Sequence, residues 1–292
     1  MQFDETNPDH VVVRDLRMAR AATALLGGAA LGAAGALMQT LTRNPLADPG
    51  LLGINAGAAF AVVIATIALG LSAPGTLVFP ALLGATLSAV LVLLLGGSGR
   101  SGPDPVRMVL AGAALSAVFL SLTWGLLILS RQSLEIYRFW VLGSFNRVDL
   151  QQLFAVVPFF VLGFAGAAAS ATLLNPLAIG DDGARALGAR LGLARGVSAV
   201  SVILLCGTTV SLAGPIAFVG LIVPHLVRPF AHADIRRLTL GSAALGATLA
   251  VTADLAGRLL LPGQEIEAGA MMALIGGPCL IILVQRGREF RV

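Results

Sequence analysis

Few side chains in the apolar parts of this sequence could take part in acid–base, metal or ion-coupling chemistry. The apolar stretches between residues 21 and 174 contain no Asp, Glu, Lys, Arg or His, and the later stretches contain only His225, Asp254 and Arg258. Ion-coupled membrane proteins usually carry ionisable groups at membrane depth, because the ion must bind there. We therefore expect no catalytic residue, no metal site and no cofactor.

The three ionisable residues have simple structural interpretations. Asp254 precedes Arg258 by four residues, so the two share a helix face and can form an ion pair. This spacing favours a structural or docking pair over a proton relay. His225 follows Pro224, and a hydrogen bond near a helix end is favoured over a buried proton carrier.

Residue usage also excludes one kind of chemistry. All nineteen basic residues are arginine, and the phosphate-binding P-loop requires a lysine. Energy from ATP would therefore have to come from a separate chain. Cys206 and Cys279 lie inside apolar runs, which predicts buried thiols rather than a disulfide or a thiolate metal site.

The overall composition is that of a membrane protein. The 292 residues are 57% hydrophobic and 12% charged, and the mean hydropathy is +0.91. The pI of about 10.3 could suggest nucleic-acid binding, but the arginines are scattered between apolar runs, as they are in membrane proteins. We therefore predict an all-α polytopic helical bundle that does not bind nucleic acid.

Apolar runs divide the chain into about nine membrane spans in a single transmembrane domain covering residues 1–292. Most runs reach the roughly 20 residues that a helix needs to cross a bilayer. Residues 215–227 are too few to cross alone, unless irregular backbone lies inside the protein. The runs are 21–42, 51–72, 76–95, 108–130, 151–174, 197–213, 215–227, 238–261 and 268–285.

The arginines favour one orientation. With the carboxyl terminus in the cytoplasm, alternation places twelve of the nineteen arginines inside. Residues 1–19 then form a short external segment, and Tyr137 and Trp140 lie at the outer interface. The seven external arginines are Arg14, Arg17, Arg20, Arg131, Arg138, Arg147 and Arg258.

The polar stretch "QTLTRNPLADPGLLG" at residues 39–53 interrupts the first two apolar runs. In this orientation its central part "RNPLADPG", residues 43–50, is a cytoplasmic turn, in which prolines end one helix and restart another. Its prolines and glycines fix a bend that a continuous helix could not make. The residues expected to form the break are Asn44, Pro45, Pro49 and Gly53.

Several blocks of sequence resemble the FecCD-type permease family, the membrane subunits of ABC importers for ferric siderophores, haem and cobalamin. The resemblance covers nearly the whole chain from residue 16 and implies the fold of a type II ABC importer permease. The blocks are "LRMAR" at 16–20, "GAALGAAGALMQTLTRNPLADPGLLGINAGA" at 28–58, "FWVLGSF" at 139–145, "AIGDDGARALGARLG" at 178–192, "GPIAFVGLIVPHLVR" at 214–228 and "ADLAGRLLLPGQEIEAGAMMALIGGP" at 253–278.

The resemblance implies three kinds of partner: a second permease subunit, ATPase subunits on the cytoplasmic face and an extracytoplasmic substrate-binding protein. In this family the binding protein presents acidic side chains to outer-face arginines. The matching positions here are Arg17, Arg20 and Arg258. An arginine fork suits a carboxylate.

The resemblance also implies an ATPase-coupling loop at residues 178–196. Acidic residues after a glycine are typical of a helix start, where they face the positive end of the helix dipole. The residues expected to couple to the ATPase are Gly180, Asp181, Ala184, Arg185, Leu187 and Gly188. The break at 44–53 is expected to lie beside the translocation path.

This chain departs from the family pattern at two places. Family members have ten helices, with one full crossing before the "LRMAR" position, where this chain has about fifteen residues. Glu267 stands where the family has a proline, which places an additional acid at the outer end of the last span.

The sequence thus predicts an ABC importer permease for an iron chelate, in the cell membrane, with ATP hydrolysis in a separate subunit. A cobalamin or haem permease, a secondary transporter without an ATPase and a non-transporting membrane scaffold are the alternatives. A secondary transporter should carry acids near the membrane midplane.

Overall fold

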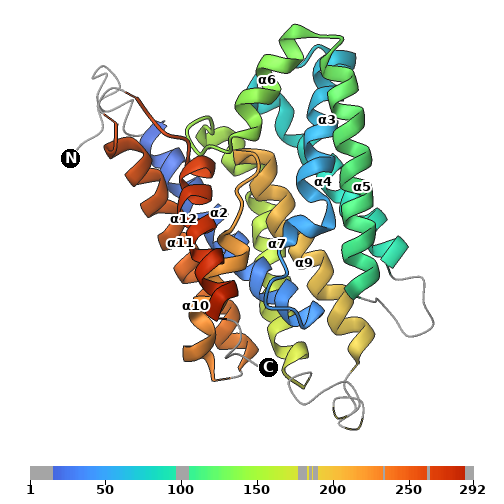
Figure 1. The fold of residues 1–292 in the computed structure, drawn as a ribbon, viewed down its shortest axis with the longest axis vertical. Coiled ribbons are helices and arrows are strands. Elements are labelled where there is room, and N and C mark those ends of the chain that lie inside the picture. Colours follow the sequence, from blue (N-terminus) through green and yellow to red (C-terminus); the bar gives the residue numbers. More distant parts are fainter. Residues whose placement is uncertain are drawn as a thin grey trace.

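The computed structural model describes residues 16–96, 105–176, 183, 186, 190–232, 234–261 and 264–286, and all regular structure in these ranges is helical. Figure 1 shows the helices side by side, with the start of α2 and the end of α12 toward opposite ends of the bundle. The elements are α2 (Met18–Thr42), η2 (Pro49–Leu52), α3 (Ile54–Leu69), α4 (Pro74–Gly96), α5 (Pro105–Leu127), α6 (Arg131–Val141), α7 (Leu150–Leu174), α9 (Leu191–Ala213), α10 (Val219–Ala231), α11 (Ile235–Leu259) and α12 (Ala268–Arg286).

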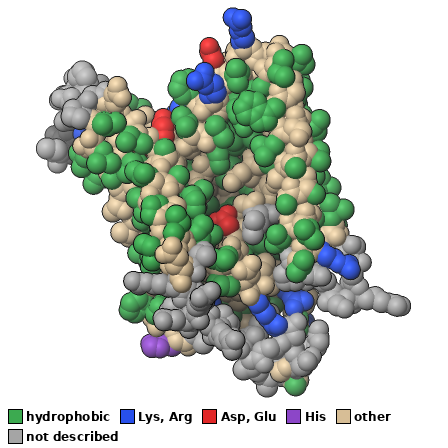
Figure 2. Space-filling view, in the orientation of Figure 1, with side chains coloured by type: hydrophobic (Ala, Val, Ile, Leu, Met, Phe, Trp, Pro, Cys, Tyr) green, Lys and Arg blue, Asp and Glu red, His purple; other side chains and the backbone are tan. Residues whose placement is uncertain are grey.

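The helices confirm a helical membrane protein. Six of them, α2, α4, α5, α7, α9 and α11, are long and apolar enough to cross a membrane, and α3, α10 and α12 are shorter apolar helices. Each of the nine expected apolar runs overlaps one of these helices. In Figure 2 hydrophobic side chains cover the sides, and most of the visible charge lies toward the top and bottom, although acidic surface also shows at mid-height.

Helix α2 packs against α11 with backbone in close contact. A Cβ atom on Gly32 would lie 2.1 Å from the carbonyl oxygen of Ser242, and one on Gly28 would lie 2.4 Å from that of Gly246. Small residues allow such approach, which stabilises helix pairs where lipid offers no hydrophobic driving force. Gly28 and Gly32 therefore lie on the face of α2 that packs against α11.

Helix α10 begins inside the protein rather than at a membrane surface. Residues 214–218 are not helical, and Gly214 and Phe218 have positive φ angles of 73° and 70°. The backbone here is crowded, because a Cβ on Gly214 would lie 2.3 Å from the Trp140 carbonyl oxygen. The short run 215–227 thus begins with irregular backbone inside the protein, as its length led us to expect.

Helix α6 is an element that the hydropathy pattern did not reveal. It is short and amphipathic, and it lies at the upper end of the molecule in Figure 1. Ser130 caps it by accepting a hydrogen bond from the backbone N–H of Ser133. Its buried face carries Tyr137, whose ring meets Trp124 edge-on at 6.0 Å, while Arg138 is exposed.

Two expected segments, 178–196 and 1–19, can be compared with the structure only where it describes their residues. Helix α9 begins at Leu191, so the last part of the expected loop 178–196 is helical. The structure describes only Gly183 and Ala186 between residues 177 and 189. The expected external segment 1–19 lies outside the described residues up to residue 15, and α2 begins at Met18.

Candidate functional site

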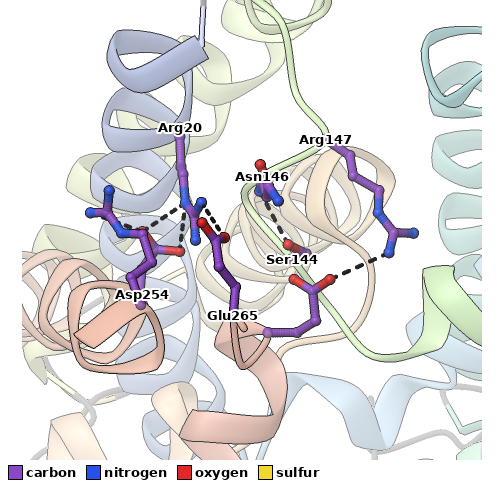
Figure 3. Close-up of polar contacts among 8 residues, drawn as sticks. Arg20, Ser144, Asn146, Arg147, Asp254 and Glu265 are labelled. Carbon is purple, nitrogen blue, oxygen red and sulfur yellow. Dashed lines mark hydrogen bonds and ion pairs between the residues drawn. The ribbon is translucent and has the colours of Figure 1, made fainter. Parts of the chain in front are cut away.

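Four charged side chains meet where α2 begins and α11 ends (Figure 3). The Nε–H of Arg20 donates to both carboxylate oxygens of Asp254, at 3.0 and 2.9 Å, and Nη1 donates to Glu265 Oε2 at 2.7 Å. Arg258 Nη2 lies 3.6 Å from Asp254 Oδ2, which confirms the pair expected from their spacing. We refer to Arg20, Asp254, Arg258 and Glu265 as the outer cluster, after the side of the membrane that the arginine distribution predicts for Arg20 and Arg258.

The two acids of the outer cluster lie in different environments. The side chain of Asp254 is 5% exposed and that of Glu265 is 47% exposed, although both bind Arg20, whose own side chain is 10% exposed. Asp254 belongs to α11, whereas Glu265 belongs to the non-helical residues that precede α12. The cluster therefore has one buried carboxylate and one that solvent reaches.

The segment 264–267 also pairs with the loop before α7. Glu267 accepts from Arg147 Nη2 at 3.4 Å, and the Arg147 guanidinium lies over the Phe139 ring, 5.1 Å from its centroid. Backbone bonds reinforce this contact, since Gly269 N–H donates to the Gly143 carbonyl at 2.8 Å. The acid that replaces the family's proline is thus paired with Arg147.

A cavity of about 400 Å³ lies next to this pairing. Its wall combines the aromatic side chains of Phe139 and Trp140 with the guanidinium of Arg147 and with serine hydroxyls. Cavities of this kind, mostly apolar with a few polar groups, suit small-molecule binding. The serine residues on its wall are Ser72, Ser144 and Ser211.

The opposite end of α2 is held by one amide. Gln39 is buried, and its Nε2 donates to the carbonyl oxygens of Gly220 at 3.3 Å and Leu221 at 3.0 Å. Pro224 has no N–H to bond the Gly220 carbonyl four residues earlier in α10. Gln39 therefore donates the hydrogen bond that Pro224 cannot donate. Arg228 Nη2 in turn donates to Gln39 Oε1 at 3.0 Å.

The same end joins α7 to α11. Asn175 Oδ1 accepts from the backbone N–H of Ile235 at 2.9 Å, and Asp234 caps α11 by accepting from the backbone N–H of Arg236 at 2.8 Å. That last hydrogen bond favours the charged carboxylate and lowers the pKa of Asp234 below its usual value.

The stretch 39–53 contains the expected helix break, but only its first half is a terminal turn. Helix α2 ends at Thr42, and Arg43 has a positive φ of 49°. The chain then returns toward the middle of the bundle, where Asp48, Pro49 and Leu31 all lie around Gly220. Leu31 is about 16 Å before the end of α2.

The expected turn at residues 43–50 thus includes a part that packs inside the bundle, because Asp48 and Pro49 lie against Gly220. Asp48 caps η2, with Oδ1 accepting from Gly50 N–H at 2.7 Å, and lines a narrow internal cavity with Asn55 and Cys206. Gly53 ends η2 with a φ of 69° and lies against Ser88, whose hydroxyl donates to the Gly53 carbonyl at 2.8 Å. This segment is re-entrant.

Asp48 is an acid at membrane depth that the sequence analysis missed. It stands outside the apolar runs, so counting ionisable residues within them could not find it. The local signal was present, because Asp-Pro-Gly after an alanine is typical of a capped turn. The depth of the turn depends on its packing against Gly220, which local sequence does not report.

The structure brings together only some of the residues expected to dock partners. Arg20 and Arg258 meet in the outer cluster, while Arg17 is exposed one turn before Arg20. Arg20 is buried and paired within the chain. The expected coupling residues Gly180, Asp181, Ala184, Arg185, Leu187 and Gly188 lie outside the described residues.

Comparison with known proteins places this arrangement in a family. The model of the FecCD transport family matches residues 1–286. The chain belongs to this family. The resemblance inferred from the sequence blocks is thereby confirmed.

Relatives of this FecCD chain are similar over nearly its whole length. It is 41% identical to "Probable siderophore transport system permease protein YfiZ" of Bacillus subtilis, covering 98% of this chain and 86% of YfiZ. It is also 41% identical to the ferric enterobactin transport system permease protein FepD of Escherichia coli, covering 95% and 83%. The vitamin B12 import system permease protein BtuC of Yersinia enterocolitica is 35% identical, covering 99% and 85%.

A solved structure shares the fold of the FecCD chain. It is described as "An inward-facing conformation of a putative metal-chelate type ABC transporter", with a TM-score of 0.85 and 29% identity over 98% of this chain and 92% of that one. This agreement supports the overall arrangement of helices described above.

Proposed function

We propose that this chain is the transmembrane permease subunit of an ABC importer that moves a ferric siderophore or a similar iron chelate into the cytoplasm by ATP-driven alternating access. The observation that carries the proposal is its 41% identity, over nearly its whole length, to permeases named for siderophore and ferric enterobactin transport. The absence of lysine supports ATP hydrolysis in a separate subunit.

The transporter contains two permease subunits, identical or related, two ATPase subunits and a substrate-binding protein. The apolar helices lie in the cytoplasmic membrane, with the outer cluster on the extracytoplasmic side. Exposed apolar side chains on α5, among them Val118, Leu122 and Trp124, support contact with lipid or with the second permease subunit.

The class of transporter is tested by ATPase association. Arg185 and Leu187 lie in the proposed coupling loop, so changing both to alanine should lower copurification of the ATPase while the permease still inserts in the membrane. Arg131 and Arg138, on the opposite side, provide the matched control pair. Undiminished copurification of the double variant would contradict the coupling assignment.

The substrate class is tested by uptake. Cells that carry the complete transporter should accumulate radioactive iron supplied as a ferric siderophore. A cobalamin permease is the closest alternative, because the chain is also 35% identical to BtuC, and a haem permease is another. Accumulation of labelled cobalamin or haem, without accumulation of iron chelate, would replace the proposed substrate.

Asp48 gives the ion-coupled secondary transporter a specific test. It is an acid at membrane depth beside a narrow cavity, which is the placement such a transporter requires. Asp48→Asn keeps an acceptor for the Gly50 N–H and removes the charge. We expect this variant to retain ATP-dependent uptake. Loss of uptake, together with accumulation driven by an ion gradient in vesicles lacking ATPase, would favour the secondary transporter.

A further inference from the structure

The outer cluster is electrically balanced within the chain. Two arginines, Arg20 and Arg258, face two carboxylates, Asp254 and Glu265, so the formal charges cancel. Both guanidinium groups approach the same oxygen, Asp254 Oδ2, at 2.9 and 3.6 Å, and therefore lie side by side. An arginine pair of this kind is a receptor for a carboxylate only if one of the resident acids can leave.

The geometry identifies which acid can leave. Asp254 is buried, accepts two hydrogen bonds from Arg20 and is carried by a helix in tight contact with α2. Glu265 is 47% exposed, and among the residues that the structure describes its one hydrogen bond comes from Arg20 Nη1 at 2.7 Å. Exposed ion pairs contribute little stability, whereas removing one partner of a buried pair is costly.

The backbone beside Glu265 is packed closely against α11. Ile266 N–H donates to the Gly257 carbonyl at 3.0 Å, and a Cβ on Gly257 would lie 2.3 Å from the Ile266 carbonyl oxygen. The segment is thus packed on α11 immediately after Glu265. Rotation of the long Glu265 side chain into solvent is enough to uncover Arg20 Nη1.

Arg258 has capacity for a second contact. Its side chain is 34% exposed, and its nearest acid contact is the 3.6 Å approach to Asp254. A carboxylate that arrives from outside can therefore contact Arg20 and Arg258 together, which Glu265 does not do in this structure.

We propose that Glu265 is a placeholder for a partner's carboxylate: in the free permease it occupies Arg20, and an acidic side chain of the substrate-binding protein displaces it. This inference rests on the proposed function, in which Arg17, Arg20 and Arg258 dock that protein. Exchanging one carboxylate for another keeps Arg20 paired in both states, so neither state holds an uncompensated buried charge. It also makes release of Glu265 a consequence of docking.

The test measures the affinity of the transport system's own binding protein for the complete transporter in lipid nanodiscs. Glu265→Gln removes the internal competitor and leaves the cluster with one net positive charge. We expect binding to tighten about tenfold at low salt and to become more salt-dependent. Unchanged or weaker binding by this variant would overturn the placeholder role.

Glu267→Gln is the matched control, because it makes the same charge change two residues away, in an acid that pairs with Arg147 instead. It should change the affinity less than about twofold. Equal tightening by both variants would show a general charge effect and would also overturn the proposal. Glu265→Asp, which keeps the charge but shortens the reach to Arg20, should tighten binding by an intermediate amount and provides a second variant if Glu265→Gln does not fold.

Arg258→Gln separates the docking assignment from the placeholder role of Glu265. If it weakens binding while Glu265→Gln fails to tighten it, the docking assignment stands and the placeholder role fails. If Arg258→Gln leaves binding unchanged, the outer cluster is not the docking site, and both fail.

Discussion

The two ends of α2 are held in place by different chemistry. At its outer end Arg20 joins α2 to α11 through ion pairs with Asp254 and Glu265. At its inner end Gln39 joins α2 to α10 through hydrogen bonds to two backbone carbonyls. The outer contact is between charges, and the inner contact depends on the position of a proline.

The difference shows which end can exchange partners. A carboxylate on an arginine can be replaced by another carboxylate, so the outer end can accept an acidic side chain from another protein. The Gln39 amide compensates for a hydrogen bond that Pro224 removes from α10, and no incoming side chain is needed there. The outer end is therefore suited to recognition, and the inner end fixes the shape of α10.

The largest loss of stability is expected from removing the charge of Asp254, the buried acid that binds Arg20. Asp254→Asn leaves Arg20 with only its exposed partner, and the free energy of unfolding should fall by about 3 to 5 kcal/mol. Unfolding in detergent micelles measures this, with Glu135→Gln on the exposed face of α6 as the control. A loss below about 1 kcal/mol would mean that Asp254 is not the main anchor.

A smaller effect is expected at the inner end. Gln39→Leu leaves the Gly220 carbonyl without its donor, so stability should fall by about 1 to 3 kcal/mol. Thr40→Val is the control, because the Thr40 hydroxyl bonds only within α2, to Ala36. Gln39→Glu should behave like Gln39→Leu, since a carboxylate keeps the Arg228 contact but cannot donate to a carbonyl. Full stability of Gln39→Glu would contradict the role given to the amide.

The smallest loss of stability is expected from breaking the pair between Arg147 and Glu267, the acid that stands where the family has a proline. Arg147 and Glu267 are 32% and 22% exposed and 3.4 Å apart, so Glu267→Gln should cost at most about 1 kcal/mol. The same unfolding measurement checks this. A loss as large as that of Asp254→Asn would show that Arg147 anchors α12 more firmly than its exposure indicates.

Sequence reasoning found the helices that repeat an apolar pattern and missed those that do not. The apolar runs located nine helices, and the spacing of Asp254 and Arg258 predicted their pairing. Helix α6 was missed because its charged and aromatic residues, such as Arg138 and Phe139, do not form an apolar run. The pairing of Arg20 with both acids was also missed, because it joins residues 234 and 245 positions apart.

Composition and residue spacing by themselves determined that this chain is a helical membrane protein without a P-loop, because hydropathy and local motifs depend on neighbouring residues. The FecCD family was recognised from the resemblance of whole sequence blocks. Only the tertiary structure decided that Asp48 lies at membrane depth, that Glu265 and Asp254 share Arg20, and that Gln39 supports α10. These contacts form between segments that are distant in sequence, and their geometry is set by how closely the helices pack.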